Sequence, residues 1–200
     1  MANAPDLAAL LCSRICHDLI SPVGAVSNGV ELLEGGVDPE IASLLNDSAR
    51  TALAALGYFR IAFGAVTEDA AAISPSELGA IARAYFSAGR HRVVWPSGGD
   101  ATPRAEAKLA LLLAMAAVTA SPIGGAIEMS LGGDTGARVS GARLGMPTEC
   151  AALLSDPAAV ATAPREAHVA LLAAHARSMG RSVAIVQDEA ALSLIARRAG

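Results

Sequence analysis

The sequence predicts an α+β fold in which a long helical hairpin precedes a layered domain of helices and strands. In the first third of the chain, apolar residues recur every three or four positions, as they do on one face of an α-helix. Beyond Ser74 the pattern changes to short β-rich runs, helical segments and turns rich in glycine and proline. We therefore expect two domains, residues 1–73 and residues 74–200.

The first helix is expected from about residue 5 to residue 33. Pro22 lies inside it, and we expect a bend there because proline removes a backbone donor without interrupting the apolar stripe. Gly35 and Gly36 are expected to end the helix. The stripe consists of Leu7, Leu11, Ile15, Leu19, Val23, Val26, Val30 and Leu33.

The second helix begins with a strong start signal, because Asp38 can cap it and Pro39 suits its first turn. A short connection between two long amphipathic helices predicts an antiparallel hairpin. Two helices cannot bury both stripes alone, so we predict a homodimer in which two hairpins form a four-helix bundle. The second stripe consists of Ile41, Leu45, Ser48, Ala52, Leu56, Phe59, Phe63 and Val66.

The second domain is expected to begin at Ser74, which Glu77 follows at the spacing of a capping box. We expect its helices to cover one face of a mainly antiparallel sheet. The last strand is the least distinct, since residues 189–198 would also suit a terminal helix. The expected helices are 78–87, 104–120 and 164–179, and the expected strands are 92–95, 124–131, 138–144, 183–187 and 192–196.

Composition excludes several functions. A net charge of −4 argues against nucleic acid as a partner, because phosphate binding needs a basic surface. Three cysteines, Cys12, Cys16 and Cys150, are too few for a disulfide framework and fit the reducing cytoplasm. No signal peptide is visible, and the longest apolar run, 109–120, is too short to span a bilayer. We therefore expect a cytoplasmic protein without a membrane partner.

The candidate reactive residue is His17. It lies two positions from both Ile15 and Leu19, so it points away from the apolar stripe and toward water. Asp18 follows it and can orient the imidazole or accept its proton. An exposed imidazole among mostly small residues suits a nucleophile that must meet another protein. Its neighbours on that face are Ser13, Arg14, Ile20, Ser21 and Gly24, and we expect all but Ser13 to contact the partner.

A metal site at Cys12, Cys16 and His17 is the main alternative for this segment. His17 is rotated by about 100° from Cys16, and no fourth ligand is evident. We therefore predict no metal and interpret the cysteines as small packed thiols. His168 and His175 also lack partner ligands, and we interpret them as surface or packing residues.

The segment from His17 to Pro22 resembles the H-box of sensor histidine kinases, with an acidic residue after the histidine and a proline five places on. Over residues 17–33 the sequence is similar to the ChpT family of alphaproteobacterial histidine phosphotransferases. The resemblance implies a degenerate histidine-kinase-like ATPase domain, an α/β sandwich, after the hairpin. It also implies that His17 accepts a phosphoryl group while Asp18 orients the ring.

Three departures from the kinase pattern indicate that the second domain binds no nucleotide. Ala116 occupies the position of the magnesium-binding asparagine, six residues before Pro122. The expected glycine-rich lid is replaced by a segment that contains Glu166, which would repel phosphates. The adenine-binding aspartate–glycine pair is replaced by residues 143–147. We therefore expect no cofactor on this chain, with Mg²⁺ on the partner receiver domain.

The resemblance implies a phosphorelay in which a receiver aspartate phosphorylates His17 and a second receiver takes the phosphoryl group. It implies a hybrid cell-cycle kinase of the CckA type as donor, and response regulators of the CtrA and CpdR types as acceptors. Two alternatives are an ATP-dependent sensor histidine kinase and a dimeric adaptor that works without phosphorylation.

Overall fold

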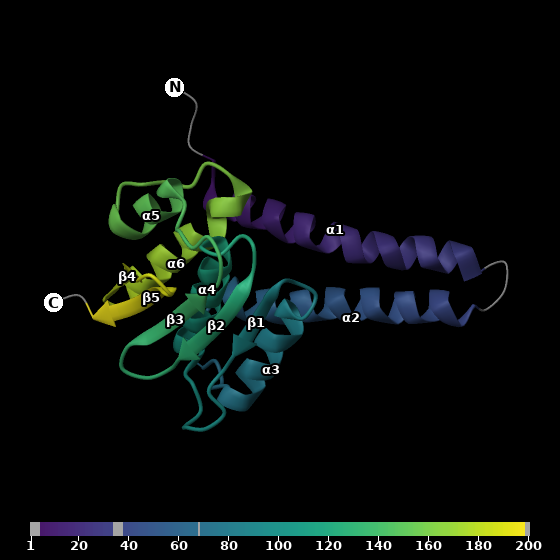
Figure 1. Cartoon of the computed structure of the whole chain (residues 1–200), viewed down its shortest axis with the longest axis horizontal. Helices are drawn as coiled ribbons and strands as arrows, with labels where there is room; N and C mark the ends of the chain where they lie inside the picture. Colours follow the sequence, from purple (N-terminus) through teal and green to yellow (C-terminus); the bar gives the residue numbers. More distant parts are fainter. Residues whose placement is uncertain (1–4, 34–37, 68, 199–200) are drawn as a thin grey trace.

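A computed structural model of the chain describes residues 5–33, 38–67 and 69–198. Two long helices, α1 (Leu7–Leu33) and α2 (Pro39–Ala62), lie side by side and project from the layered domain (Figure 1). The predicted helical hairpin is therefore confirmed. α1 is continuous through Pro22, and the expected stop at Gly35 and Gly36 lies outside the described residues.

The start of α2 follows the predicted chemistry. The Asp38 carboxylate accepts a hydrogen bond of 2.8 Å from the Glu40 amide, with Pro39 in the first turn. The helix ends earlier than its stripe, because Phe63 is the C-cap and Val66 lies in the connection to the next domain. At the start of α3 (Pro75–Phe86), the Ser74 side chain accepts from the Glu77 amide at 3.2 Å, as predicted.

The second domain contains a five-stranded sheet in the order β1-β2-β3-β5-β4. β1 pairs with β2 in parallel, and the other neighbours are antiparallel. The last segment is a strand, so the helical alternative for residues 189–198 is wrong. The strands are β1 (His91–Val94), β2 (Gly125–Ser130), β3 (Thr135–Ser140), β4 (Arg181–Gln187) and β5 (Ala191–Arg198).

Two details differ from the prediction. β3 begins at Thr135, inside the run expected to be a turn, because Thr135 pairs with Ala196 of β5. An unexpected helix, α5 (Thr148–Ser155), follows Pro147. It is too short for a clear helical repeat, although Pro147 and Glu149 mark its beginning.

Helix α4 (Arg104–Thr119) forms the centre of the core and is buried on all sides from Ala107 to Ala117. It packs between β3, α2 and α6 (Ala167–Ser178), which follows the short 3-10 helix η1 (Pro164–Glu166). The Tyr58 hydroxyl of α2 donates a buried hydrogen bond of 2.6 Å to the Leu111 carbonyl of α4. The hairpin and the layered domain therefore share one core.

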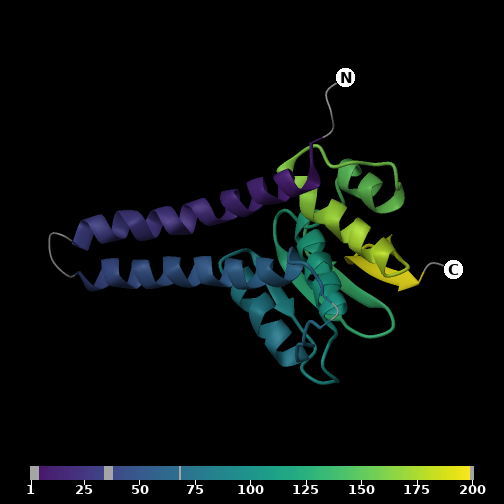
Figure 2. The ribbon, with the colours of Figure 1, turned by 180° about the vertical axis from the view of Figure 1, so that it is seen from behind.

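The first turns of α1 lie against the second domain, as the view from behind also shows (Figure 2). α1 contacts η1 and α6, and Leu7, Leu11, Ile15 and Leu19 pack against the common core. By length and hydropathy alone α1 would pass as a membrane span, and 6% of its most apolar window is buried in the chain. Arg14 and Asp18 interact within that helix, which does not suit hydrocarbon.

Candidate functional site

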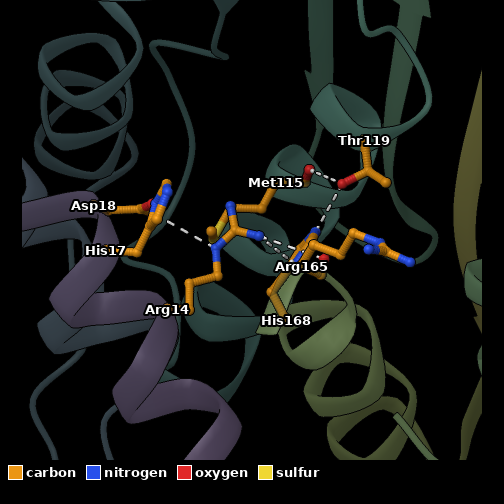
Figure 3. Close-up of polar contacts among 7 residues, drawn as sticks. All are labelled: Arg14, His17, Asp18, Met115, Thr119, Arg165 and His168. Carbon is orange, nitrogen blue, oxygen red and sulfur yellow. Dashed lines mark hydrogen bonds and ion pairs between the residues drawn. The ribbon is translucent and has the colours of Figure 1, made fainter. Parts of the chain in front are cut away.

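His17 projects from α1 into solvent, with 86% of its side chain exposed. Its Nδ1 lies 3.1 Å from Oδ1 of Asp18 (Figure 3). Because an ionised carboxylate only accepts hydrogen bonds, the contact places the ring proton on Nδ1 and leaves the Nε2 lone pair free. The contact with Asp18 is compatible with the predicted orientation of the imidazole, whose reactivity stays a prediction.

Arg14 lies one turn before Asp18 and turns toward the second domain (Figure 3). Its Nε lies 3.5 Å from Asp18 Oδ2, while one terminal nitrogen, NH1, is 3.2 Å from His168 Nδ1 and donates to the Arg165 carbonyl at 3.4 Å. The Arg14 side chain is only 22% exposed. Its contact with a partner therefore stays a prediction, and within the chain its guanidinium already joins α1 to α6.

The surface around His17 is open to a large partner. A depression of about 340 Å³ is lined by Ser13, Arg14, His17, Asp18, Pro164 and Arg165, so both domains contribute to it. Ile20 is 72% exposed, and a Cβ added at Gly24 would meet nothing within 4 Å. Ser21 is exposed as well. The structure thus places the predicted partner-binding residues around the imidazole without testing what they bind.

Three residues near this site, Tyr85, Thr119 and His168, were not assigned to it from the sequence. His168 is fully buried, and its Nε2 lies 2.9 Å from the Thr119 hydroxyl. Burial and then the Asp18 charge raise the pKa of Tyr85 in α3 to about 12. His168 lies four residues before Leu172 on the buried face of α6, and this spacing was the only sequence signal for its burial. The spacing does not reveal that His168 contacts α1.

Comparisons with known proteins identify the family of this chain. The family described as histidine phosphotransferase C-terminal domain matches residues 75–191. The chain belongs to that family. Protein phosphotransferase ChpT of Brucella abortus (strain 2308) is 41% identical over 162 residues, which cover 78% of both proteins. A solved structure of a bacterial phosphotransferase superposes with a TM-score of 0.78 and 30% identity, covering 98% of both chains.

In this histidine phosphotransferase, positions that resemble the nucleotide site of kinases have structural roles. Ala116 is fully buried in α4 and offers no ligand atom to a cation. Glu166 is 3% exposed, and its Oε2 accepts from the amides of Thr162 and Ala163 at 2.9 and 3.3 Å. The sequence predicted that Glu166 would repel phosphates. In the structure the Glu166 carboxylate accepts hydrogen bonds from these two amides, which are therefore not free to bind a phosphate.

Gly124 and Gly125, which follow Pro122 beside the position of Ala116 in the kinase pattern, also have a structural explanation. Gly124 has a φ of +118°, and a Cβ there would lie 2.6 Å from the Arg90 carbonyl oxygen. At Gly125 a Cβ would lie 2.2 Å from the Ser140 carbonyl oxygen. Both glycines are required by close backbone contacts beside β1, β2 and β3, so their presence is no sign of nucleotide binding.

The cysteines correct one interpretation. Cys12 and Cys16 are exposed in this chain instead of packed, and only Cys150 is buried. No group of three or more histidine, cysteine or acidic side chains suited to a metal ion occurs among the described residues. His175 packs as expected, because its Nε2 lies 2.9 Å from the Ala105 carbonyl oxygen.

Proposed function

We propose that this histidine phosphotransferase carries phosphoryl groups between two receiver domains, with His17 as the acceptor and then the donor. The observation that supports this role is the exposed imidazole, whose Nδ1 is held by Asp18 while Nε2 faces solvent. Family membership supports phosphotransfer, and the loss of the nucleotide-binding positions favours a receiver over ATP as the donor.

The proposed step is a direct transfer from an aspartyl phosphate. The lone pair on His17 Nε2 attacks phosphorus, the P–O bond to the receiver aspartate breaks, and that carboxylate leaves as an anion. The ring becomes positively charged as the N–P bond forms, and Asp18 stabilises this charge through the Nδ1 proton. Transfer to the second receiver reverses the exchange. In this scheme Mg²⁺ comes with the receiver, and the present chain supplies no cofactor.

The proposed partners follow from the family resemblance. The donor is a CckA-like hybrid kinase receiver, and the acceptors are CtrA-like and CpdR-like response regulators in the cytoplasm. The exposed face around Ile20, Ser21 and Gly24 offers a docking surface next to the imidazole. Arg165 lines the edge of the depression, so we expect a receiver docked at His17 to meet the second domain as well.

Label transfer from a radiolabelled phospho-receiver tests the proposal. We expect label on the wild-type chain in an acid-labile, base-stable form, and none on His17→Gln. Asp47→Asn, on the exposed surface of α2, is the matched control and should accept label normally. Label that persists in His17→Gln would place the acceptor elsewhere, and a wild-type chain that takes no label while still binding receivers would favour the adaptor alternative.

Calorimetric titration with Mg-ATP separates this proposal from an ATP-dependent kinase. We expect no saturable binding, because Ala116 has no cation ligand and Glu166 blocks the amides before α6. Saturable binding accompanied by autophosphorylation of His17 would contradict the proposal.

We also propose that the chain works as a homodimer. Val23 and Val30 of α1 are exposed, as are Leu53 and Leu56 of α2. At about 100° per residue, these pairs lie beside the α1–α2 contact and on the same side of the hairpin. A second hairpin placed on that side would cover them in a four-helix bundle and leave His17 accessible.

A further inference from the structure

A continuous line of polar contacts runs from the core of the second domain to the reactive histidine. It begins at Thr119 of α4, passes through His168 of α6, and reaches Arg14, Asp18 and His17 of α1 (Figure 3). His168 and Arg14 have no part in the proposed transfer itself. Their placement raises the question of what the second domain contributes to the chemistry.

Only one assignment of donors and acceptors is consistent with all the hydrogen bonds in this line. A guanidinium only donates, so His168 Nδ1 must accept from Arg14 at 3.2 Å. The ring proton then lies on Nε2 and is donated to the Thr119 hydroxyl at 2.9 Å, while that hydroxyl donates to the Met115 carbonyl at 3.4 Å. Burial, followed by the charge of Arg14, lowers the pKa of His168 to about 3. The ring is therefore neutral at pH 7 and can accept.

From His168 to His17 the line consists of planar groups, so the orientation of each one affects the next. His168 and the Arg165 carbonyl hold one end of the guanidinium, and its Nε forms an ion pair of 3.5 Å with Asp18 without a hydrogen bond. Asp18 then uses Oδ2 toward Arg14 and Oδ1 toward His17. Tyr85, whose side chain interacts with both Asp18 and Arg14, borders the same carboxylate.

We propose that Arg14 is a positioning residue, anchored on His168 and the Arg165 carbonyl, that holds Asp18 so that His17 keeps its proton on Nδ1 and its Nε2 free for phosphorylation. This inference rests on the proposed function of His17. It gives the second domain a role in phosphotransfer through side chains that never touch the phosphoryl group.

The tautomer of His17 tests the proposal without any partner protein. In ¹⁵N NMR of the full chain, with His17 assigned through His17→Gln, we expect the Nδ1–H form in the wild type. Arg14→Met and His168→Phe should each give a mixture of tautomers. A contribution limited to fold stability would leave the tautomer of this exposed ring unchanged.

Phosphorylation of His17 by phosphoramidate provides the rate, because this small donor needs no docking surface. We expect Arg14→Met and His168→Phe to be slower by about tenfold, the effect of losing one hydrogen bond to a charged group. The double variant should lose little more than either single variant, since both break the same line. Arg50→Met, which removes an exposed arginine beside Asp47 on α2, should react like the wild type.

A conservative replacement distinguishes positioning from packing. His168→Asn keeps an oxygen acceptor near the place of Nδ1, so we expect a tautomer and rate close to those of the wild type, whereas His168→Phe fills the space without an acceptor. Wild-type behaviour in folded Arg14→Met would overturn the proposal, as would equal losses in His168→Asn and His168→Phe. Failure of receivers to phosphorylate the wild type would contradict the proposed function. The tautomer measurement would still test the role of Arg14, because it needs no receiver.

Discussion

At the scale of single residues, two carboxylates near the proposed transfer surface, those of Asp18 and Glu166, differ in their surroundings. Asp18 is partly exposed and shared between His17 and Arg14, so it remains available to a developing positive charge. Glu166 is buried and bound to backbone amides of its own loop. The first carboxylate therefore has a chemical role in the proposed transfer, and the second has a structural one.

Asp18→Asn should slow label transfer from a phospho-receiver by about a hundredfold, the lower end of the range for a positioned acid–base group. The amide keeps the shape of the side chain and loses the negative charge that stabilises the phosphorylated ring. The initial rate of label transfer, compared with Asp47→Asn, measures the effect. A wild-type rate in Asp18→Asn would show that Asp18 is an ordinary surface residue.

His168 should make the fold sensitive to acid. Its pKa is about 3 in the folded chain and 6.5 in the reference state, so between these values the unfolded chain binds more protons. The stability contributed by the neutral ring is complete above pH 6.5 and is lost as the pH falls toward 3. At about pH 5 the loss amounts to roughly 2 kcal/mol of unfolding free energy. Urea titrations of His168→Asn should show a correspondingly shallower acid dependence, and parallel curves would contradict this.

At the scale of elements, the distance between α1 and α2 depends on a glycine. A Cβ at Gly29 would lie 2.7 Å from Cδ2 and 2.9 Å from Cγ of Leu45, so the two helices approach closely at this level. Gly57, in the interior of α2, has nothing within 4 Å of the same position. Close helix packing therefore requires a glycine at position 29, whereas no neighbour requires one at position 57.

Gly57→Ala should raise the free energy of unfolding by about 0.5–1 kcal/mol, because alanine is the better helix former and meets no neighbour. Gly29→Ala gains the same helical propensity and must also displace Leu45, so we expect no net gain. Thermal unfolding of both variants measures the difference. An equal rise in melting temperature would show that Leu45 moves away without cost.

At the scale of the whole molecule, the hairpin leaves apolar residues on two sides, and the proposed four-helix bundle uses one of them. Leu53 lies on the side that also exposes Val23, Val30 and Leu56. Leu44 is exposed on the other side of the same helix. This difference allows dimerisation through the hairpin to be tested with the same substitution at two positions.

Leu53→Glu should convert the dimer to a monomer at micromolar concentration, because a carboxylate would be buried without a partner. Leu44→Glu should leave the association unchanged. Sedimentation equilibrium of the two variants provides the comparison. Equal association of Leu53→Glu and the wild type would exclude this face of the hairpin.

The sequence alone was sufficient for local features of the fold, because caps, stripes and turns depend on nearby residues. Asp38 and Ser74 start the helices they were expected to start, and the spacing around His17 predicted its exposure. The short helix α5 was missed, since eight residues carry too little periodicity. Cys12 and Cys16 were predicted to be packed and are exposed, because their burial depends on tertiary contacts of α1 that the local sequence does not specify.

By itself the sequence determined the hairpin, the class of the second domain and the exposure of His17 on α1. Only the tertiary structure decided that Arg14 turns inward to His168, and that Glu166 binds its own loop. The physical reason is distance along the chain: Arg14 and His168 are 154 residues apart, and no local rule of helix geometry determines which distant side chain receives a donor.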